Sequence, residues 1–141
     1  MVKILITRRT FPEAADALRE AGAEVVIWDQ PDSPGYEELK KEVADVDGLY
    51  AHITNEVDGA VMDAAPNLKV ITEFGVGYDN IDVDAANDRG IAVCNTPGIL
   101  SESTADEAFA LLMAMGRRTH DLPAMVKRGE WGDFDPLAYL A

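Results

Sequence analysis

The sequence predicts an α/β protein built on a five-stranded parallel sheet with helices on both faces. Short apolar runs alternate with amphipathic stretches over residues 1–98, a rhythm typical of parallel strands that are joined by helices. Turn-forming Gly, Pro and Asn residues separate many of these stretches. Five strands in this rhythm favour the flavodoxin-like order 2-1-3-4-5.

Each predicted strand is a short run rich in apolar and β-branched residues, and it is too short to form a helix of ordinary length. The first run opens the chain, and its length and β-branched residues indicate a core strand and not a signal peptide. The predicted strands cover residues 2–7, 24–28, 48–52, 68–72 and 91–94.

The predicted helices lie between these strands, at residues 11–21, 36–43, 58–65 and 83–88. The first should end at Gly22, because glycine is the usual residue just beyond a helix C-terminus. Pro66 and Asn67 stop the third, and Gly90 follows the fourth. A loop rich in Pro, Asp and Ser precedes the second helix.

A single long helix is predicted from Glu102 to about Leu122, with Ser101 as its N-cap. Acidic residues fall in its early turns and basic ones near its end, as the helix dipole favours. The helix is apolar on nearly all sides, which requires burial all round. We therefore expect a second domain, or a second copy of the chain, to cover the face that the sheet leaves open.

Composition excludes several classes of partner. The chain carries 26 acidic and 12 basic residues, a net charge of −14, which argues against nucleic acid and anionic membrane surfaces. No apolar run approaches the ~20 residues of a membrane span. The lone cysteine, Cys94, is expected to be a buried apolar residue, and a cytoplasmic location fits. His52 and His120 have no partner at metal-ligand spacing, so no metal site is predicted.

The segment 73–82, which follows the fourth predicted strand, is the best candidate for a ligand site. Gly75 and Gly77 let the chain turn sharply and bring bare N–H groups close to a ligand. Ligands of open α/β sheets bind at the carboxyl ends of the strands, where this turn lies. Paired backbone N–H groups there suit a carboxylate or a phosphate.

Three further positions have two interpretations each. His52 ends the third predicted strand. It is either a partly exposed loop residue or a residue that contacts the substrate. Thr104 is a local helix-start residue, or its hydroxyl and the free N–H groups of the first turn face a phosphate. The polar residues of 79–82 are expected to make local turn bonds and start the next helix, although they could also suggest a metal cluster.

A long ordered series of motifs then resembles one family. The series comprises residues 74–82, 85–86, 89–93, 95–98, 104–106, 110–112, 117–118 and 129–131. As a combination it resembles the D-isomer-specific 2-hydroxyacid dehydrogenases, especially the glyoxylate and hydroxypyruvate reductases.

This resemblance implies a division of the chain into two parts. Residues 1–98 would form the flavodoxin-like substrate domain, and residues 99–141 the inter-domain helix and dimer arm at the start of a truncated cofactor domain. The helix at 101–122 would form a homodimer. The Rossmann domain with its GxGxxG fingerprint is missing and would follow residue 141.

The resemblance also implies roles for individual residues. The N–H groups of Val76 and Gly77 would hold the carboxylate of a small 2-keto or 2-hydroxy acid, and His52 and Ile53 would line its pocket. Val76 would also lie near the nicotinamide of NAD or NADP, and Thr104 would contact the cofactor. The family's catalytic Arg, Glu and His would lie beyond residue 141, so no catalytic residue is predicted in this chain.

The expected function is therefore hydride transfer between NAD(P)H and a small 2-keto acid by a full-length enzyme, with the chain inactive by itself. Two alternatives remain open at this stage. One is a dehydrogenase-like corepressor that senses nucleotides, and the other is a stand-alone flavodoxin-like module.

Overall fold

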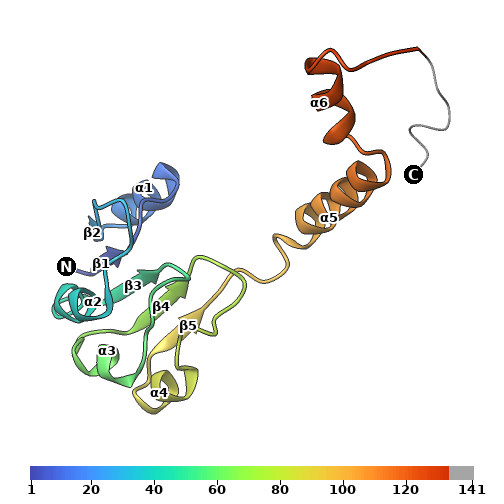
Figure 1. The fold of residues 1–141 in the computed structure, drawn as a ribbon. Coiled ribbons are helices and arrows are strands. Elements are labelled where there is room, and N and C mark those ends of the chain that lie inside the picture. Colours follow the sequence, from blue (N-terminus) through green and yellow to red (C-terminus); the bar gives the residue numbers. More distant parts are fainter. Residues whose placement is uncertain (134–141) are drawn as a thin grey trace. The chain divides into compact units, whose positions relative to one another are not determined.

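The computed structural model describes residues 1–133 and confirms the predicted sheet (Figure 1). All strand pairs are parallel, and the order is β2-β1-β3-β4-β5. The strands are β1 (Lys3–Ile6), β2 (Glu24–Ile27), β3 (Gly48–Ala51), β4 (Val70–Glu73) and β5 (Ala92–Cys94). The carboxyl ends of β1, β3, β4 and β5 therefore meet at one edge of the sheet.

The four predicted helices between the strands are also present. They are α1 (Pro12–Glu20), α2 (Tyr36–Glu42), α3 (Gly59–Asp63) and α4 (Val83–Asp88). Asp58 caps α3 by accepting the Val61 N–H, and Asp82 caps α4 by accepting the Ala85 N–H. Both caps satisfy N–H groups that the first helical turn leaves without a partner.

The main core lies between one face of the sheet and helices α2, α3 and α4 (Figure 1). Leu5, Leu49 and Ile71 point from adjacent strands into this layer, and each is at most 1% exposed. In β4 the alternation of buried Ile71 with the less buried Val70 and Thr72 is the two-residue period of a strand. This layer fixes the register of the three strands whose ends carry the site, because a slip of one residue would turn these side chains out of the core.

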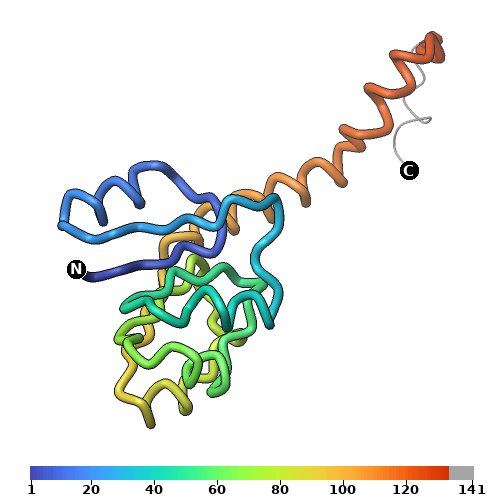
Figure 2. The backbone as a smooth tube through the Cα atoms, turned by 90° about the vertical axis from the view of Figure 1, so that its left-hand side faces the viewer, coloured from blue at the N-terminus to red at the C-terminus, as the bar shows by residue number. Residues whose placement is uncertain are grey.

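Helix α1 lies on the opposite face of the sheet (Figure 2). An apolar hollow of about 290 Å³ remains there, between Leu18 of α1 and the outward side chains of β1, β3 and β4, such as Ile4 and Val70.

The chain divides into two compact units, Met1–Gly98 and a second that begins at Ile99. The second unit contains α5 (Ser101–Gly116) and α6 (Asp121–Lys127). The prediction of one continuous helix to Leu122 is therefore wrong. Gly116, a poor helix former, is the last residue of α5, and Arg118 has a φ of +50°, which a continuing α-helix does not allow.

Two smaller predictions are also wrong. Leu100 and not Ser101 occupies the N-cap position of α5, and no side chain caps this helix. Cys94 is exposed, since it ends the edge strand β5, which has a neighbour on one side only. No helix within residues 1–133 is long and apolar enough to cross a membrane. The part of the predicted dimer arm beyond residue 133 lies outside the described residues.

Candidate functional site

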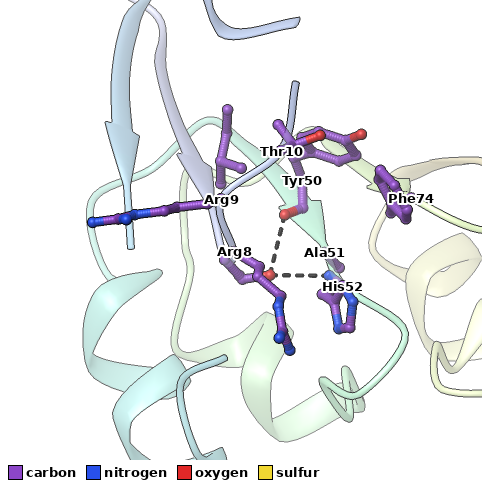
Figure 3. A pocket seen from close by; sticks show the side chains of 9 residues that line it. Arg8, Arg9, Thr10, Tyr50, Ala51, His52 and Phe74 are labelled. Carbon is purple, nitrogen blue, oxygen red and sulfur yellow. Dashed lines mark hydrogen bonds between the residues drawn. The ribbon is translucent and has the colours of Figure 1, made fainter. Parts of the chain in front are cut away.

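The candidate site lies at the carboxyl edge of the sheet, where a hollow of about 100 Å³ opens at the ends of β1 and β3 (Figure 3). Arg8 and His52 extend from these two strand ends on the same side, and Phe74 borders the hollow from the end of β4. Thr7 joins the strand ends, because its hydroxyl donates to the Tyr50 carbonyl (3.3 Å) and accepts the His52 N–H (3.0 Å).

The predicted glycine turn follows β4, and neighbouring residues occupy most of its polar groups. The Gly75 N–H donates to Glu73 Oε1 at 3.1 Å. The Gly75 carbonyl accepts the N–H and the hydroxyl of Thr96, at 3.2 and 3.0 Å. The Val76 carbonyl accepts the side-chain amide of Asn95 at 2.8 Å. The loop after β5 thus holds the carbonyl side of the turn.

Two donors of the turn remain. Within residues 1–133, no acceptor bonds the N–H of Val76 or Gly77. Both residues are exposed, so these N–H groups are accessible to a ligand. Backbone N–H groups prefer to be paired, and two successive ones at a bend form a concavity suited to an anion. The carboxylate site at Val76 and Gly77 stays a prediction, and these two N–H groups are the donors that it would use.

Ile53 is placed against this turn. Its Cγ2 lies 3.0 Å from the position that a Cβ on Gly75 would occupy, closer than real Cβ atoms normally approach another atom. The loop after β3 packs directly on the turn after β4, so a side chain at position 75 would have to displace Ile53. The structure thus packs Ile53 against Gly75, the residue before the Val76–Gly77 pair, and 55% of Ile53 remains exposed. Its role in lining the substrate pocket stays a prediction.

His52 is held by its backbone and its ring is half-buried. The His52 N–H donates to Thr7 Oγ1 and to Asn55 Oδ1, at 3.0 and 3.2 Å. The ring lies 6.2 Å from that of Phe74. Burial, and then the positive charge of Arg8, lower the pKa of His52, while Glu73 opposes the shift. The imidazole is therefore neutral at pH 7 and can donate or accept a hydrogen bond.

A buried polar cluster behind the turn was missed by sequence reasoning. Glu73 is completely buried, and its Oε2 accepts the side-chain amide of Asn80 at 3.0 Å. The same Asn80 nitrogen donates to the Asn55 carbonyl at 2.9 Å. The expected helix start is confirmed at Asp82, whose carboxylate accepts the Ala85 N–H, whereas the Asn80 side chain bonds distant residues and not its own turn. An acidic residue that ends an apolar strand was the available signal.

Thr104 lies in the first turn of α5, in the second unit. Its N–H donates to the Leu100 carbonyl at 2.9 Å. The predicted cofactor contact of Thr104, like that of Val76, stays a prediction.

The fold and the turn together define a class: a flavodoxin-like domain with an exposed glycine turn at the carboxyl edge of its parallel sheet. Comparison with known proteins makes this specific. The family model for the D-isomer specific 2-hydroxyacid dehydrogenase, catalytic domain, matches residues 4–129. The chain belongs to this family.

Individual relatives agree. A glyoxylate reductase of Thermococcus litoralis is 44% identical over 98% of this chain and 43% of its own length. One of Aeropyrum pernix is 39% identical over 92% of this chain and 38% of its own length. The chain therefore spans about two fifths of the length of these relatives.

Solved structures give the same result. A Thermus thermophilus protein superposes with a TM-score of 0.87 and 41% identity, over 96% of this chain and 43% of its own. An NADPH-dependent glyoxylate/hydroxypyruvate reductase of Sinorhizobium meliloti, in complex with NADP and malonate, superposes with a TM-score of 0.71 and 31% identity. That match covers 92% of this chain and 39% of the reductase.

Proposed function

We propose that the full-length protein transfers a hydride between NADH or NADPH and a small 2-keto acid such as glyoxylate. The observation that carries the proposal is the pair of N–H groups at Val76 and Gly77 that no acceptor within residues 1–133 bonds, in a turn where most of the other polar groups are occupied. In this role the two N–H groups bind the substrate carboxylate and fix its orientation. Ile53 and His52 form the wall beside it.

The nicotinamide cofactor supplies the hydride chemistry, and this chain contributes one side of its site. The Val76 N–H is one of the two carboxylate donors, so the Val76 side chain suits a position between the substrate and the nicotinamide. Thr104 offers a hydroxyl in the first turn of α5 for a cofactor contact. No residue of this chain is assigned as the acid–base group, and the sequence of residues 1–141 contains no GxGxxG fingerprint.

Two further features complete the proposal. The segment 101–122 would form a homodimer, and its support is the set of large apolar side chains exposed on α5, including Phe109, Leu112 and Met115. A cytoplasmic location is supported by the single cysteine of residues 1–141, which permits no disulfide within this part of the protein.

The direct test is turnover. The full-length gene product should oxidise NADH or NADPH when glyoxylate or hydroxypyruvate is added. The purified 141-residue chain should show none, because it lacks the fingerprint that holds the pyrophosphate. Absence of turnover by the full-length protein with any small 2-keto acid would contradict the proposal.

A further inference from the structure

The completely buried carboxylate of Glu73 lies directly behind the turn that carries Val76 and Gly77. Both of its oxygens face donors: Oε1 accepts the Gly75 N–H (3.1 Å) and Oε2 accepts the Asn80 side-chain amide (3.0 Å). An acceptor-only group is therefore the one that this position can hold with every bond satisfied.

The cluster continues from Asn80 to the loop after β3. The side-chain nitrogen of Asn80 bonds Glu73 and also donates its second hydrogen to the Asn55 carbonyl (2.9 Å). Asn55 is 2% exposed, and its Oδ1 accepts the His52 N–H. Its own amide donates to the Pro34 carbonyl at 3.1 Å. One continuous chain of bonds thus runs from the Gly75 N–H to the His52 N–H.

Backbone bonds join the same two segments further from the site. The Val57 N–H donates to the Asn80 carbonyl (2.8 Å), and the Asp82 N–H donates to the Val57 carbonyl (3.0 Å). The two segments are therefore already paired at residues 57 and 80–82. The side-chain cluster additionally fixes the relative position of residues 52–55 and 73–77, which lie nearer the proposed ligand.

We propose that Glu73, acting through Asn80 and Asn55, is a positioning residue that sets the Val76 and Gly77 N–H groups against the wall formed by His52 and Ile53. By binding the Gly75 N–H, the carboxylate turns that donor inward and leaves the next two for the ligand. Through Asn80 it fixes the distance between the turn and the opposite loop. This inference rests on the proposed function, since it names what positions the same carboxylate site.

Burying a charge costs free energy unless it is well bonded, and bonds to a charged acceptor are the stronger kind. An apolar side chain at 73 would leave the Gly75 N–H and one of the two hydrogens of the Asn80 amide without an acceptor. The carboxylate therefore makes the turn rigid in one arrangement.

The first test variant is Glu73→Gln in the full-length protein. Glutamine keeps the shape but offers one oxygen and one NH₂ group, so a donor faces either the Gly75 N–H or the Asn80 amide. One bond of the cluster must break. The control is Asp47→Asn, since Asp47 also bonds a backbone N–H, of Lys3 (2.9 Å), and a second donor, Lys69 Nζ (2.9 Å). Asp47 precedes β3 at the opposite edge of the sheet.

Steady-state kinetics separate positioning from mere stability. Glu73→Gln should raise KM for glyoxylate about tenfold, the change that corresponds to ~1.4 kcal/mol, and leave KM for the nicotinamide cofactor unchanged. Asp47→Asn should leave both values unchanged. An unchanged KM for glyoxylate in a folded Glu73→Gln protein would overturn the proposal.

Hydrogen–deuterium exchange tests the same inference without substrate. Glu73→Gln should speed exchange in both segments, 52–55 and 73–80, whereas Asp47→Asn should not. Faster exchange in 73–80 alone would overturn the coupling of the two loops. If the wild-type protein reduces no 2-keto acid, the proposed function fails and the exchange result still decides whether Glu73 positions the turn.

A second variant, Asn80→Ala, covers the case in which Glu73→Gln does not fold. It removes the link to the Asn55 carbonyl and keeps the bond between Glu73 and the Gly75 N–H. It should raise KM for glyoxylate less than Glu73→Gln does, and it should speed exchange mainly in 52–55. Wild-type values of both in a folded Asn80→Ala protein would overturn the proposal.

Discussion

Ile53 and Gly75 are packed so closely that a Cβ on Gly75 would stand 3.0 Å from Ile53 Cγ2. The contact joins the loop after β3 to the turn after β4 beside the candidate carboxylate site. The shape of that site therefore depends on the absence of a side chain at Gly75 as well as on the N–H groups of the turn.

Gly75→Ala should disturb the site more than the fold. The added methyl group must push Ile53 aside, and Ile53 is exposed and free to change rotamer, so the stability loss should stay below about 1 kcal/mol. The KM for glyoxylate should rise by roughly threefold to tenfold because the displaced side chain alters the pocket wall. Steady-state kinetics of the full-length protein measure the change.

Gly132→Ala is the matched control for this substitution. A Cβ at Gly132 meets no atom within 4 Å, and Gly132 is not part of the candidate site. Its KM for glyoxylate should therefore stay close to that of the wild type. Equal effects of the two substitutions would show that the contact with Ile53 does not shape the site.

His52 should titrate below its ordinary range, and Arg8 should be part of the reason. Burial is the larger cause of the lowered pKa and the charge of Arg8 the second. Arg8→Gln should therefore raise the pKa of His52 without restoring its usual value of about 6.5. NMR titration of the imidazole, assigned by the loss of its resonance in His52→Asn, measures the shift.

Arg9→Gln is the control here, because Arg9 pairs with Asp29 and is not among the causes of the His52 shift.

The lowered pKa of His52 also determines how the free energy of unfolding changes with pH. Between it and about pH 6.5 the unfolded chain binds more protons, so this group's contribution to stability falls as the pH drops through that window. A pKa of His52 that is the same in wild type and Arg8→Gln would contradict the prediction.

The sequence was sufficient for the sheet and for the position of the turn, because both follow from local patterns. Strand β4 is an apolar run followed by Gly75 and Gly77, and the alternation of strands with helices fixes which edge that turn occupies. The role of Asn80 could not be found in this way. Its partners, Asn55 and Glu73, come from two separate segments, and only tertiary packing brings them together.

The break after α5 shows a different limit. Apolar residues on all sides gave no period from which to read where the helix ends, so the prediction continued to Leu122. In the structure Gly116 ends α5, and Arg118 takes a positive φ. A single glycine in an apolar, Ala-rich run is a weak stop signal, because tertiary context often overrides intrinsic propensity.

Asp58 should contribute to stability through two bonds. Its Oδ1 accepts the Val61 N–H at 3.0 Å, and its Oδ2 accepts the Tyr36 hydroxyl at 2.9 Å. Asp58→Ala should lower the free energy of unfolding by about 2 kcal/mol, and Tyr36→Phe should lower it by less, because it removes only one of the two bonds. Asp84→Ala, at an exposed position in the first turn of α4, is the control. Urea denaturation followed by circular dichroism measures all three.

The same carboxyl predicts a loss of stability in acid. The bond from the Val61 N–H is the main cause that lowers the pKa of Asp58, and the Tyr36 hydroxyl adds to it. Its contribution is therefore complete above about pH 3.9, the unfolded value, and is lost as the pH falls through the lower folded value. The difference in free energy of unfolding between the wild type and Asp58→Ala should be smaller at pH 2 than at pH 7. An equal difference at the two pH values would contradict this prediction.

The exposed apolar side chains of α5 lead to the last prediction, on assembly. Phe109, Leu112 and Met115 are 67%, 62% and 79% exposed, and exposed apolar surface of this kind marks an interaction site. If the segment 101–122 forms a homodimer, Leu112→Glu should place a charge in the interface and shift the full-length protein toward monomer. Sedimentation velocity over a range of protein concentrations measures the shift. Phe11→Glu changes an equally exposed apolar residue of the first unit, 71% exposed, and should leave the dimer intact. A Leu112→Glu protein that stays dimeric at the lowest concentration would exclude α5 from the interface.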